Sequence, residues 1–463
     1  MRCRISAKAA RPSRCWSRRS APPATTSSAR AARALAEHLA VRERRPAVAV
    51  TRLDAVLETI SHAEWRNFVA ADRTRWAILV GERPAERPPD DGAGDDIARL
   101  NVTMTDALVA VMAGRLAAAA RHIEAGLPLA ERLRAEVPNG ADLLRLTDWI
   151  RLLFAGQLDR SRALAATALD AAGPDAEAAG VWQYAISLID LHAGRPAAAA
   201  ERSTDAIRLL EWRDFTGLVA TAHAVRATAL AQLGRIGESR VVLDRLDGFD
   251  ELDIWAALQR AQAVAWVAAA EQRHPDLSEV VAVSRRGVAA GQVCLAAITS
   301  HVAVRLGHAE LVADDLHEAA LRCEGTLLPV LSAHAAAAIA RRPADLLDAA
   351  EQLAVLGLNG AAADAATHAA RLLDADGRRE AARHASQQAA RWMRPSGSAH
   401  ELTLRELDVA RRAAERWSSR AIAEQLDVSP RTVDNHLSRV YRKLGIAGRP
   451  ELAPALQALG LID

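Results

Sequence analysis

A long region of the chain has the residue pattern of helices rather than of strands. Between residues 31 and 393 nearly every stretch is rich in helix formers, with Val and Thr scattered rather than alternating, so no strand is predicted. A helix, a glycine, one or two turn residues and a second helix recur in that order. Gly114, Gly156, Gly194 and Gly234 are spaced by 42, 38 and 40 residues. One helical hairpin per unit of this length is typical of a solenoid.

Small residues at fixed positions after these turns support the same interpretation. The series continues to Gly307 and Gly377 if the stretches beginning at Glu271 and Ala340 form turns without glycine. Five residues after the glycines come Ala119, Ser161, Ala199, Ser239, Val312 and Ala382. Twelve residues after them come Gly126, Ala168, Ala206, Leu246, Ala319 and Ala389. Such positions let two helices approach closely, and the region resembles degenerate tetratricopeptide repeats. The alternative is an irregular helical domain in which abundant alanine makes any position small.

Near the C-terminus the chain predicts a helix with two very different faces, between Val428 and Gly445. Its apolar face is formed by Val433, Leu437, Val440 and Leu444. Its opposite face carries Arg431, Asp434, Asn435, Ser438 and Arg442. Ser429 is a suitable N-cap, and Gly445 suits the left-handed position that ends a helix. A merely solvated face would more often carry paired Glu and Lys.

These patterns divide the chain into four segments and predict an all-α fold. Residues 1–30 are basic and rich in Ser, Ala and Pro, and we expect a disordered leader. Residues 31–393 form the helical repeat region, which a proline-rich loop interrupts at residues 82–96. Residues 394–401 are a polar linker. Residues 402–463 are predicted to form four helices, the second and third of which make a helix-turn-helix.

The last segment resembles the LuxR-type (GerE-like) DNA-binding domain of bacterial transcription regulators. The matching residues are Leu402, Thr403, Arg405, Glu406, Ile422, Ala423, Leu426, the run from Ser429 to Gly445, Arg449, Glu451 and Leu452. The sequence departs from the family at Arg416, Ser419 and Ala421, where Gly, Asn and Glu are usual. With the repeat region, the chain resembles the C-terminal half of large actinobacterial LuxR-family regulators that have a tetratricopeptide-like sensor region. Those proteins usually begin with an ATPase domain, of which this sequence has no counterpart, so ATP-dependent switching is not implied.

The charge and side-chain chemistry of the two-faced helix agree with DNA binding. Five basic residues and one acidic residue lie between Ser429 and Arg449, a net charge of +4 on a chain of net charge +2. In the major groove Asn pairs with adenine and Asp accepts from cytosine. We therefore expect the base-reading residues, which by resemblance are also the family's, to be Asp434, Asn435 and Ser438. The expected phosphate anchors are Arg431, Thr432 and Lys443.

An apolar stripe after Pro450 predicts that two chains pair on DNA. Leu452, Leu456 and Leu459 lie at helical spacing, and an exposed stripe of this kind on a small domain usually marks a partner site. LuxR-type domains commonly dimerise through their fourth helix, so the resemblance implies the same. The alternative is that these leucines pack inward on Leu407 and Leu426 and leave a monomer.

Other chemistries lack the residues that they need. The two lysines, Lys8 and Lys443, do not follow a glycine, which excludes a P-loop, and there is no GxSxG motif. Four cysteines without a CxxC motif favour a reducing, cytoplasmic setting without structural zinc, and the 14 histidines include no HExxH. No apolar run is long enough to span a membrane. We therefore expect no cofactor, no metal and no enzymatic activity.

The sequence thus favours a sequence-specific DNA-binding transcription regulator. Its partners would be double-stranded DNA and a peptide or small-molecule effector, the effector lying on the concave face of the repeats that their first helices form. The alternative is a protein-interaction adaptor whose terminal module does not bind DNA.

Overall fold

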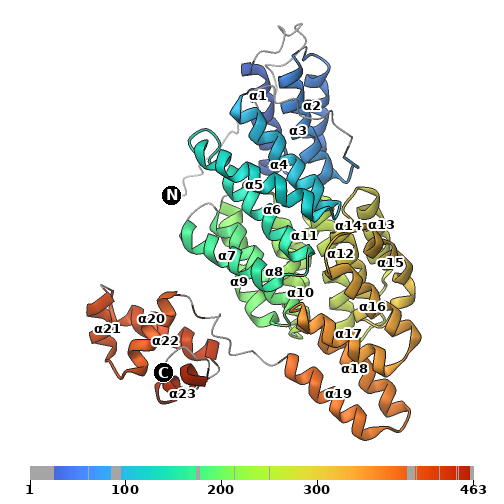
Figure 1. Ribbon diagram of the computed structural model, residues 1–463, viewed down its shortest axis with the longest axis vertical. Helices are drawn as coiled ribbons and strands as arrows, with labels where there is room; N and C mark the ends of the chain where they lie inside the picture. Colours follow the sequence, from blue (N-terminus) through green and yellow to red (C-terminus); the bar gives the residue numbers. More distant parts are fainter. Residues whose placement is uncertain are drawn as a thin grey trace, which may run out of the picture. The chain divides into compact units, whose positions relative to one another are not determined.

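The computed structural model describes residues 26–60, 62–84, 95–173, 178–212, 214–249, 251–393, 402, 404–426, 428–444, 446 and 448–458. Throughout these residues the ordered elements are helices, which confirms the all-α prediction (Figure 1). The chain forms two compact units, Met1–Ala389 and Ala390–Asp463, which we call the repeat unit and the C-terminal module. The predicted linker and the first 25 residues lie outside the described residues. Helix α1 begins at Thr26, five residues before the expected start of the helical region.

The repeat unit begins with three helices and continues as eight helical hairpins. The first three helices are α1 (Thr26–Glu37), α2 (Pro46–Leu57) and α3 (Ala63–Val80), with a short π-helix (His38–Arg42) after α1. The first helices of the hairpins are α4 (Asp96–Met112), α6 (Gly140–Phe154), α8 (Ala179–His192), α10 (Val219–Gln232), α12 (Ile254–Ala270), α14 (Val293–Arg305), α16 (Leu327–Ala340) and α18 (Asn359–Ala375). The second helices are α5 (Leu116–Arg132), α7 (Leu158–Ala172), α9 (Pro196–Trp212), α11 (Ile236–Asp247), α13 (Ser278–Ala289), α15 (Ala313–Arg322), α17 (Pro343–Val355) and α19 (Arg379–Trp392).

The hairpin turns share one backbone conformation. The six turn glycines predicted from the sequence all have a positive φ, between +71° and +92°. In the two turns without glycine this conformation is adopted by Gln272 (φ +56°) and Arg341 (φ +51°). Both turns were expected from the spacing alone, so the repeat register is confirmed. A non-glycine residue there is strained, because its Cβ meets the backbone.

The small residues after the turns lie where the two helices of a hairpin meet. All six residues five positions after the glycines are buried. Where this residue is serine, its hydroxyl donates to a backbone carbonyl twelve residues earlier: Ser161 Oγ to Trp149 O (3.1 Å) and Ser239 Oγ to Ala227 O (2.7 Å). Twelve residues after the first turn, a Cβ on Gly126 would lie 3.0 Å from Thr103 Cγ2 on the first helix of the same hairpin and 2.9 Å from Leu144 Cδ1 on the next hairpin. Close helix contact therefore explains this part of the repeat pattern.

The repeat unit closes on itself, so its inner face is not an open groove. Helices α8, α10, α12 and α14 are buried on most sides. Helix α8 contacts α18, and α14 contacts both α4 and α18. Early turns also bond to late hairpins: Glu324 N donates to Gly114 O (2.9 Å) and Thr326 Oγ1 to Ala155 O (3.0 Å). In the described residues the face that the first helices form is therefore covered where α18 packs against α8 and α14.

The C-terminal module has a core of its own. It comprises α20 (Leu404–Ala414), α21 (Ser419–Leu426), α22 (Pro430–Leu444), a short 3₁₀ helix (Arg449–Glu451) and α23 (Leu452–Ala458). The core side chains include Val409, Ile422, Val433, Val440 and Leu452. Four α-helices were expected here, and four are present.

The described helices do not include one with the length and apolar character needed to cross a bilayer. No group of three or more His, Cys, Asp or Glu side chains within these same residues is arranged to hold a metal ion.

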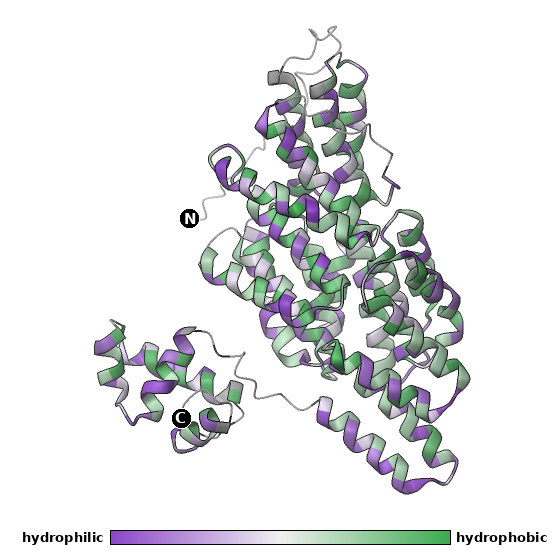
Figure 2. Cartoon of the chain, in the orientation of Figure 1, coloured by the Kyte–Doolittle hydropathy of each residue, from purple (hydrophilic) through white to green (hydrophobic). Residues whose placement is uncertain are grey.

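Figure 2 shows hydrophilic positions recurring along α19, which buries only a narrow stripe of alanines, Ala382, Ala385 and Ala389.

Candidate nucleic-acid interface

Two capped helices joined by a short turn place the candidate site. Ser418 Oγ accepts from Ala421 N (3.1 Å) at the start of α21, so Ser418 caps this helix. Ser429 Oγ accepts from Thr432 N (3.1 Å) at the start of α22. Arg405 donates from Nη2 to Leu426 O (2.7 Å) and so ties α20 to the end of α21. This geometry is a helix-turn-helix with α22 as its second helix.

Helix α22 has one fully buried and one fully exposed face. Val433 and Val440 have no exposed surface, and Leu437 is 4% exposed. The side chains of Arg431, Asp434, Asn435 and Ser438 are exposed. The structure thus brings the three candidate base readers together on a single outward face. A rigidly packed helix with an outward face of hydrogen-bonding side chains is suited to a DNA groove.

The three candidate phosphate anchors have different positions. Arg431 is exposed in the first turn of α22. Thr432 is half-buried, and its hydroxyl lies 2.8 Å from Ser429 Oγ, so it also contributes to the helix cap. Lys443 lies in the last turn of α22, and its side chain is outside the described atoms. Arg439, which the charge count included without a role, is exposed on the same helix.

Comparison with known proteins supports this geometry. Residues 400–455 match the family described as bacterial regulatory proteins, luxR family. The C-terminal module is a LuxR-family helix-turn-helix domain. Two relatives, from Mycobacterium bovis and Mycobacterium tuberculosis, are named as candidate HTH-type transcriptional regulators and are each 49% identical over 59 residues. That alignment covers 13% of this chain and 7% of each relative, so the chain matches only a small part of their length.

The leucines assigned to dimerisation belong to the core of the LuxR-family domain. Leu452 and Leu456 have no exposed surface and pack in a cluster that includes Leu407 and Leu426 at its edge. Leu459 lies outside the described residues. The premise of an exposed stripe is therefore wrong for Leu452 and Leu456, which instead bury the fourth helix against the other three. Among the described residues at this end of the domain, Pro450, Glu451, Pro454 and Gln457 are exposed.

Two arginines of the LuxR-family domain have structural roles that the sequence did not reveal. Arg449 is half-buried and donates from Nε to Ala413 O (3.4 Å), so its count as part of a basic DNA-facing patch is not supported. Arg416, at the position where glycine is usual, has a φ of +66°. The glycine preference of the family could have indicated this turn, because glycine adopts such a conformation without strain.

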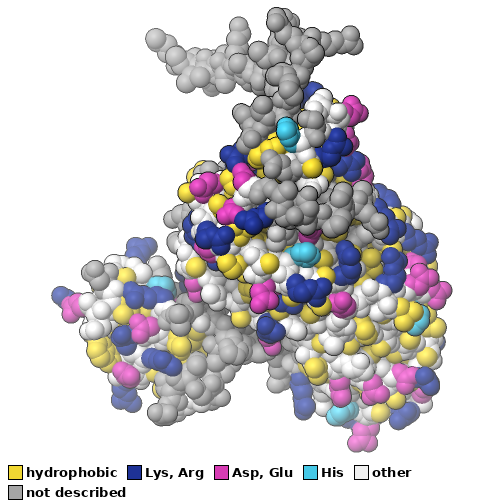
Figure 3. Space-filling model, turned by 45° about the horizontal axis from the view of Figure 1, so that its top comes forward, with side chains coloured by type: hydrophobic (Ala, Val, Ile, Leu, Met, Phe, Trp, Pro, Cys, Tyr) yellow, Lys and Arg dark blue, Asp and Glu magenta, His cyan; other side chains and the backbone are white. Residues whose placement is uncertain are grey.

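Charge is distributed differently on the repeat unit. On the face that Figure 3 shows, basic and acidic side chains are interspersed over its described residues. Many form short ion pairs along or between helices, such as Arg260 with Asp247 (2.7 Å) and Arg305 with Asp364 (2.7 Å). A surface of mixed charge does not make the phosphate-binding stripe that DNA requires.

Proposed function

We propose that this chain is a sequence-specific DNA-binding transcription regulator. The observation that carries the proposal is the outward face of α22, where Asp434, Asn435 and Ser438 are exposed on a helix whose other face is buried in a LuxR-family domain. Asn435 would pair with an adenine, and Asp434 would accept from a cytosine. Arg431, Thr432 and Lys443 would bind phosphates and position the helix.

The first test is binding of the full chain to duplexes enriched from a random DNA pool. Phosphate contacts release counterions, so affinity should fall steeply between 50 and 200 mM salt, by roughly 10³-fold if about six phosphates are contacted. A chain that enriches no duplex and shows no salt-dependent DNA binding would overturn the proposal. Binding of a protein partner alone would then favour an adaptor.

A pair of variants separates base readers from phosphate anchors. Asn435→Ala should weaken binding to the preferred site by about 1–3 kcal/mol and leave non-specific binding unchanged. Lys443→Ala should weaken both and reduce the magnitude of the salt slope by about 1. Identical behaviour of the two variants would contradict this division. Arg420→Ala, at an exposed position of α21, is the control for a general loss of charge.

The proposal includes two further parts. Two chains would occupy an inverted repeat, with recognition helices about 34 Å apart, through contacts other than Leu452 and Leu456. A sedimentation experiment that finds one chain per operator would exclude pairing.

The repeat unit would act as the sensor: a fragment beginning at residue 394 should still bind DNA but should lose regulation by effector.

A further inference from the structure

A cavity of about 400 Å³ lies in the repeat unit among α1, α3, α4 and α6. Much of its lining is apolar: Leu108, Leu143, Leu146, Ile150, Leu218 and Trp255. A volume of this size suits a small organic molecule. Trp255 packs at the edge of the apolar core of α1, α2 and α3 and also lines this cavity.

One wall of the cavity carries a buried ionic cluster. The side chain of Asp72 is 1% exposed. Its Oδ1 lies 3.4 Å from Arg75 Nη1, and its Oδ2 lies 3.8 Å from Arg33 Nε. Arg75 is held in place, because its Nη2 donates to Asn101 Oδ1 (2.8 Å) and Thr105 Oγ1 (3.1 Å). Two guanidinium groups therefore share one buried carboxylate at this wall.

Arg33 differs from Arg75 in its hydrogen bonding. Its side chain is 19% exposed, and its only close polar partner among the described residues is the loose contact to Asp72. Its guanidinium also lies 5.8 Å from the Phe68 ring. A guanidinium has five N–H donors and stays charged in proteins, so a largely buried one needs acceptors. Arg33 lines the cavity, and an acceptor placed there would meet this need.

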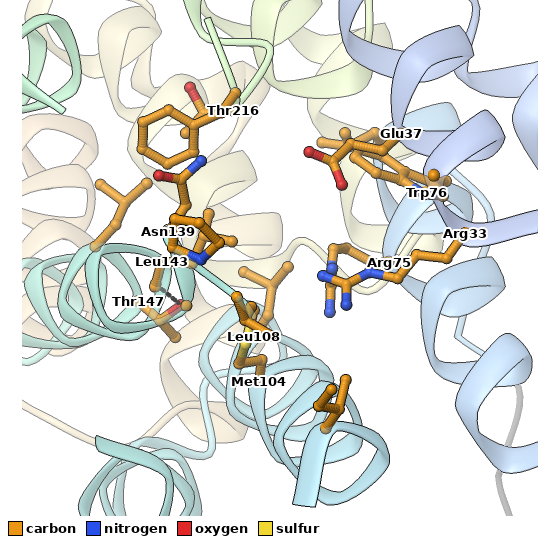
Figure 4. A pocket seen from close by; sticks show the side chains of 18 of the residues that line it. Arg33, Glu37, Arg75, Trp76, Met104, Leu108, Asn139, Leu143, Thr147 and Thr216 are labelled. Carbon is orange, nitrogen blue, oxygen red and sulfur yellow. Dashed lines mark hydrogen bonds between the residues drawn. The ribbon is translucent and has the colours of Figure 1, made fainter. Parts of the chain in front are cut away.

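Glu37, beside Arg33 on α1, is a carboxylate and therefore requires hydrogen-bond donors. Arg33 and Glu37 are one turn apart on α1, yet no ion pair within 4 Å joins them, and no other hydrogen-bond partner of Glu37 is found among the described residues. Figure 4 shows the Glu37 carboxylate pointing into the space opposite Asn139, with Leu108 and Met104 between the two walls. Side chains spaced i,i+4 have Cβ atoms about 6 Å apart. The wall thus offers a donor and an acceptor at about the separation of the two ends of a short peptide.

We propose that this cavity binds a small amphipathic zwitterion of the apolar dipeptide class, with its carboxylate on Arg33 and its ammonium on Glu37. Arg33 and Arg75 are balanced at this wall by Asp72 and Glu37, and Arg30, which also lines the cavity, is paired with Asp95 (2.7 Å). This balance favours a ligand without net charge over a simple acid or amine. The apolar side chains of the ligand lie against Leu108, Leu143 and Trp255. This inference rests on the proposed sensor role of the repeat unit and names the class of effector.

The test is calorimetric titration of the full chain with three forms of one peptide. Leucylphenylalanine carries both charges, its N-acetyl form only the carboxylate, and its C-terminal amide only the ammonium. We expect saturable binding of the zwitterion and roughly 10- to 100-fold weaker binding of each blocked form, because each loses one charge-assisted pair. No saturable binding of the zwitterion would overturn the site. Equal binding of a blocked form would overturn the pairing.

Variants locate the binding within the chain. Leu108→Trp fills the cavity and should abolish binding, whereas Val241→Trp, on the exposed surface of α11, should not. Arg33→Gln should weaken the zwitterion roughly 10-fold or more and leave the amide form unaffected, and Glu37→Gln should spare the N-acetyl form. Retained binding of the unaffected form shows that each variant is folded. Arg52→Gln, exposed on α2, is the matched control.

DNA binding in the absence of peptide separates this inference from the proposed function. If the chain binds peptide but no DNA, the proposed peptide site in the cavity stands and the proposed DNA-binding function is overturned. A chain that binds DNA but none of the three peptides loses only the cavity assignment.

Discussion

Helices α14 and α22 both carry polar residues, but they use them in opposite ways. In α14 the polar side chains are buried and paired inside the repeat unit: Thr299 Oγ1 accepts from Gln262 Nε2 (3.0 Å), and His301 Nε2 lies 2.9 Å from His334 Nδ1. In α22 the polar side chains Asp434 and Asn435 are exposed. A polar residue on a helix is therefore a recognition candidate only where the fold leaves it at the surface.

The difference follows from how many neighbours each helix has. Helix α14 contacts α12, α13, α15, α16 and α18, so nearly its whole surface is covered. Helix α22 contacts α20 and α21 within a small domain, which leaves one face free. The helices of the repeat unit are thus buried against one another, whereas the C-terminal module exposes one face of α22 to solvent.

The largest effect is expected from a charge in the core of the C-terminal module. Leu456→Arg places a guanidinium where the side chain has no exposed surface, and should destabilise the module by about 4 kcal/mol or more. DNA binding should be lost for single and paired half-sites alike, while hydrogen exchange in α8 and α14 stays unchanged. Gln457→Arg, on the exposed neighbour, is the control. Retained half-site binding by Leu456→Arg would show that Leu456 is not a core residue.

The next effect concerns closure of the repeat unit. A Cβ on Gly114 (φ +76°) would lie 2.7 Å from Cys323 Cβ and 3.0 Å from its Cα, whereas Gly234 (φ +73°) has no atom within 4 Å of that position. Gly114→Ala should therefore destabilise by about 3 kcal/mol and Gly234→Ala by about 1 kcal/mol, the latter from backbone strain alone. Urea denaturation compares them. Equal losses would mean that the early turn does not contact the late hairpins.

Acid should weaken the repeat unit. Burial lowers the pKa of His192 to about 4 and that of His334 to about 3, with a further contribution from Arg305 in each case. Unfolded histidines bind protons below about 6.5, so stability is complete above that pH and is lost as the pH falls toward 4. Burial raises the pKa of Asp253 to about 6, which partly offsets the loss because its protonation favours the folded state. Burial also lowers the pKa of His301 well below its usual value, which adds to the loss. We expect a net loss on the order of 2 kcal/mol or more at pH 5.

Hydrogen exchange of α14 and α16 at pH values from 7 to 5, corrected for intrinsic rates, measures this loss. His334→Gln should reduce the pH dependence, and His317→Gln, exposed on α15, should leave it unchanged. A pH dependence that is the same in His334→Gln and the parent chain would contradict the assignment.

The smallest effect is expected at the turn of Arg416. Glycine adopts the observed φ of +66° without strain but loses more entropy on folding, so Arg416→Gly should stabilise the module by about 0.5–1 kcal/mol. Arg420→Gly, within α21, should destabilise it by a similar amount. Thermal unfolding, followed by a signal from the C-terminal module, distinguishes the two variants. Destabilisation by Arg416→Gly would show that the arginine side chain makes a stabilising contact there.

Much of the local structure could be predicted from the sequence. The hairpin turns, including those at Gln272 and Arg341, the buried positions five residues later and the cap at Ser429 all follow from short-range patterns. Caps and turns depend on hydrogen bonds between residues close in the chain, and helical periodicity shows which face is apolar. The two faces of α22 were predictable for this reason.

Contacts between distant segments could not be predicted in this way. Periodicity shows that Leu452 and Leu456 form a stripe, but only the packing of α23 on α20 shows that the stripe is covered. The sequence likewise predicts Arg449 to be a surface charge, and only the structure shows that it donates a hydrogen bond to Ala413 O.

The sequence by itself thus determined the helices, their register and the family of the C-terminal module, because these depend on neighbours a few residues away. Only the tertiary structure decided that the repeats close their inner face and that Arg33, Glu37 and Trp255 line one cavity. Residues 33 and 255 are brought together by the packing of many helices. The free energy of that packing depends on side-chain volumes summed over the whole unit, which no local pattern contains.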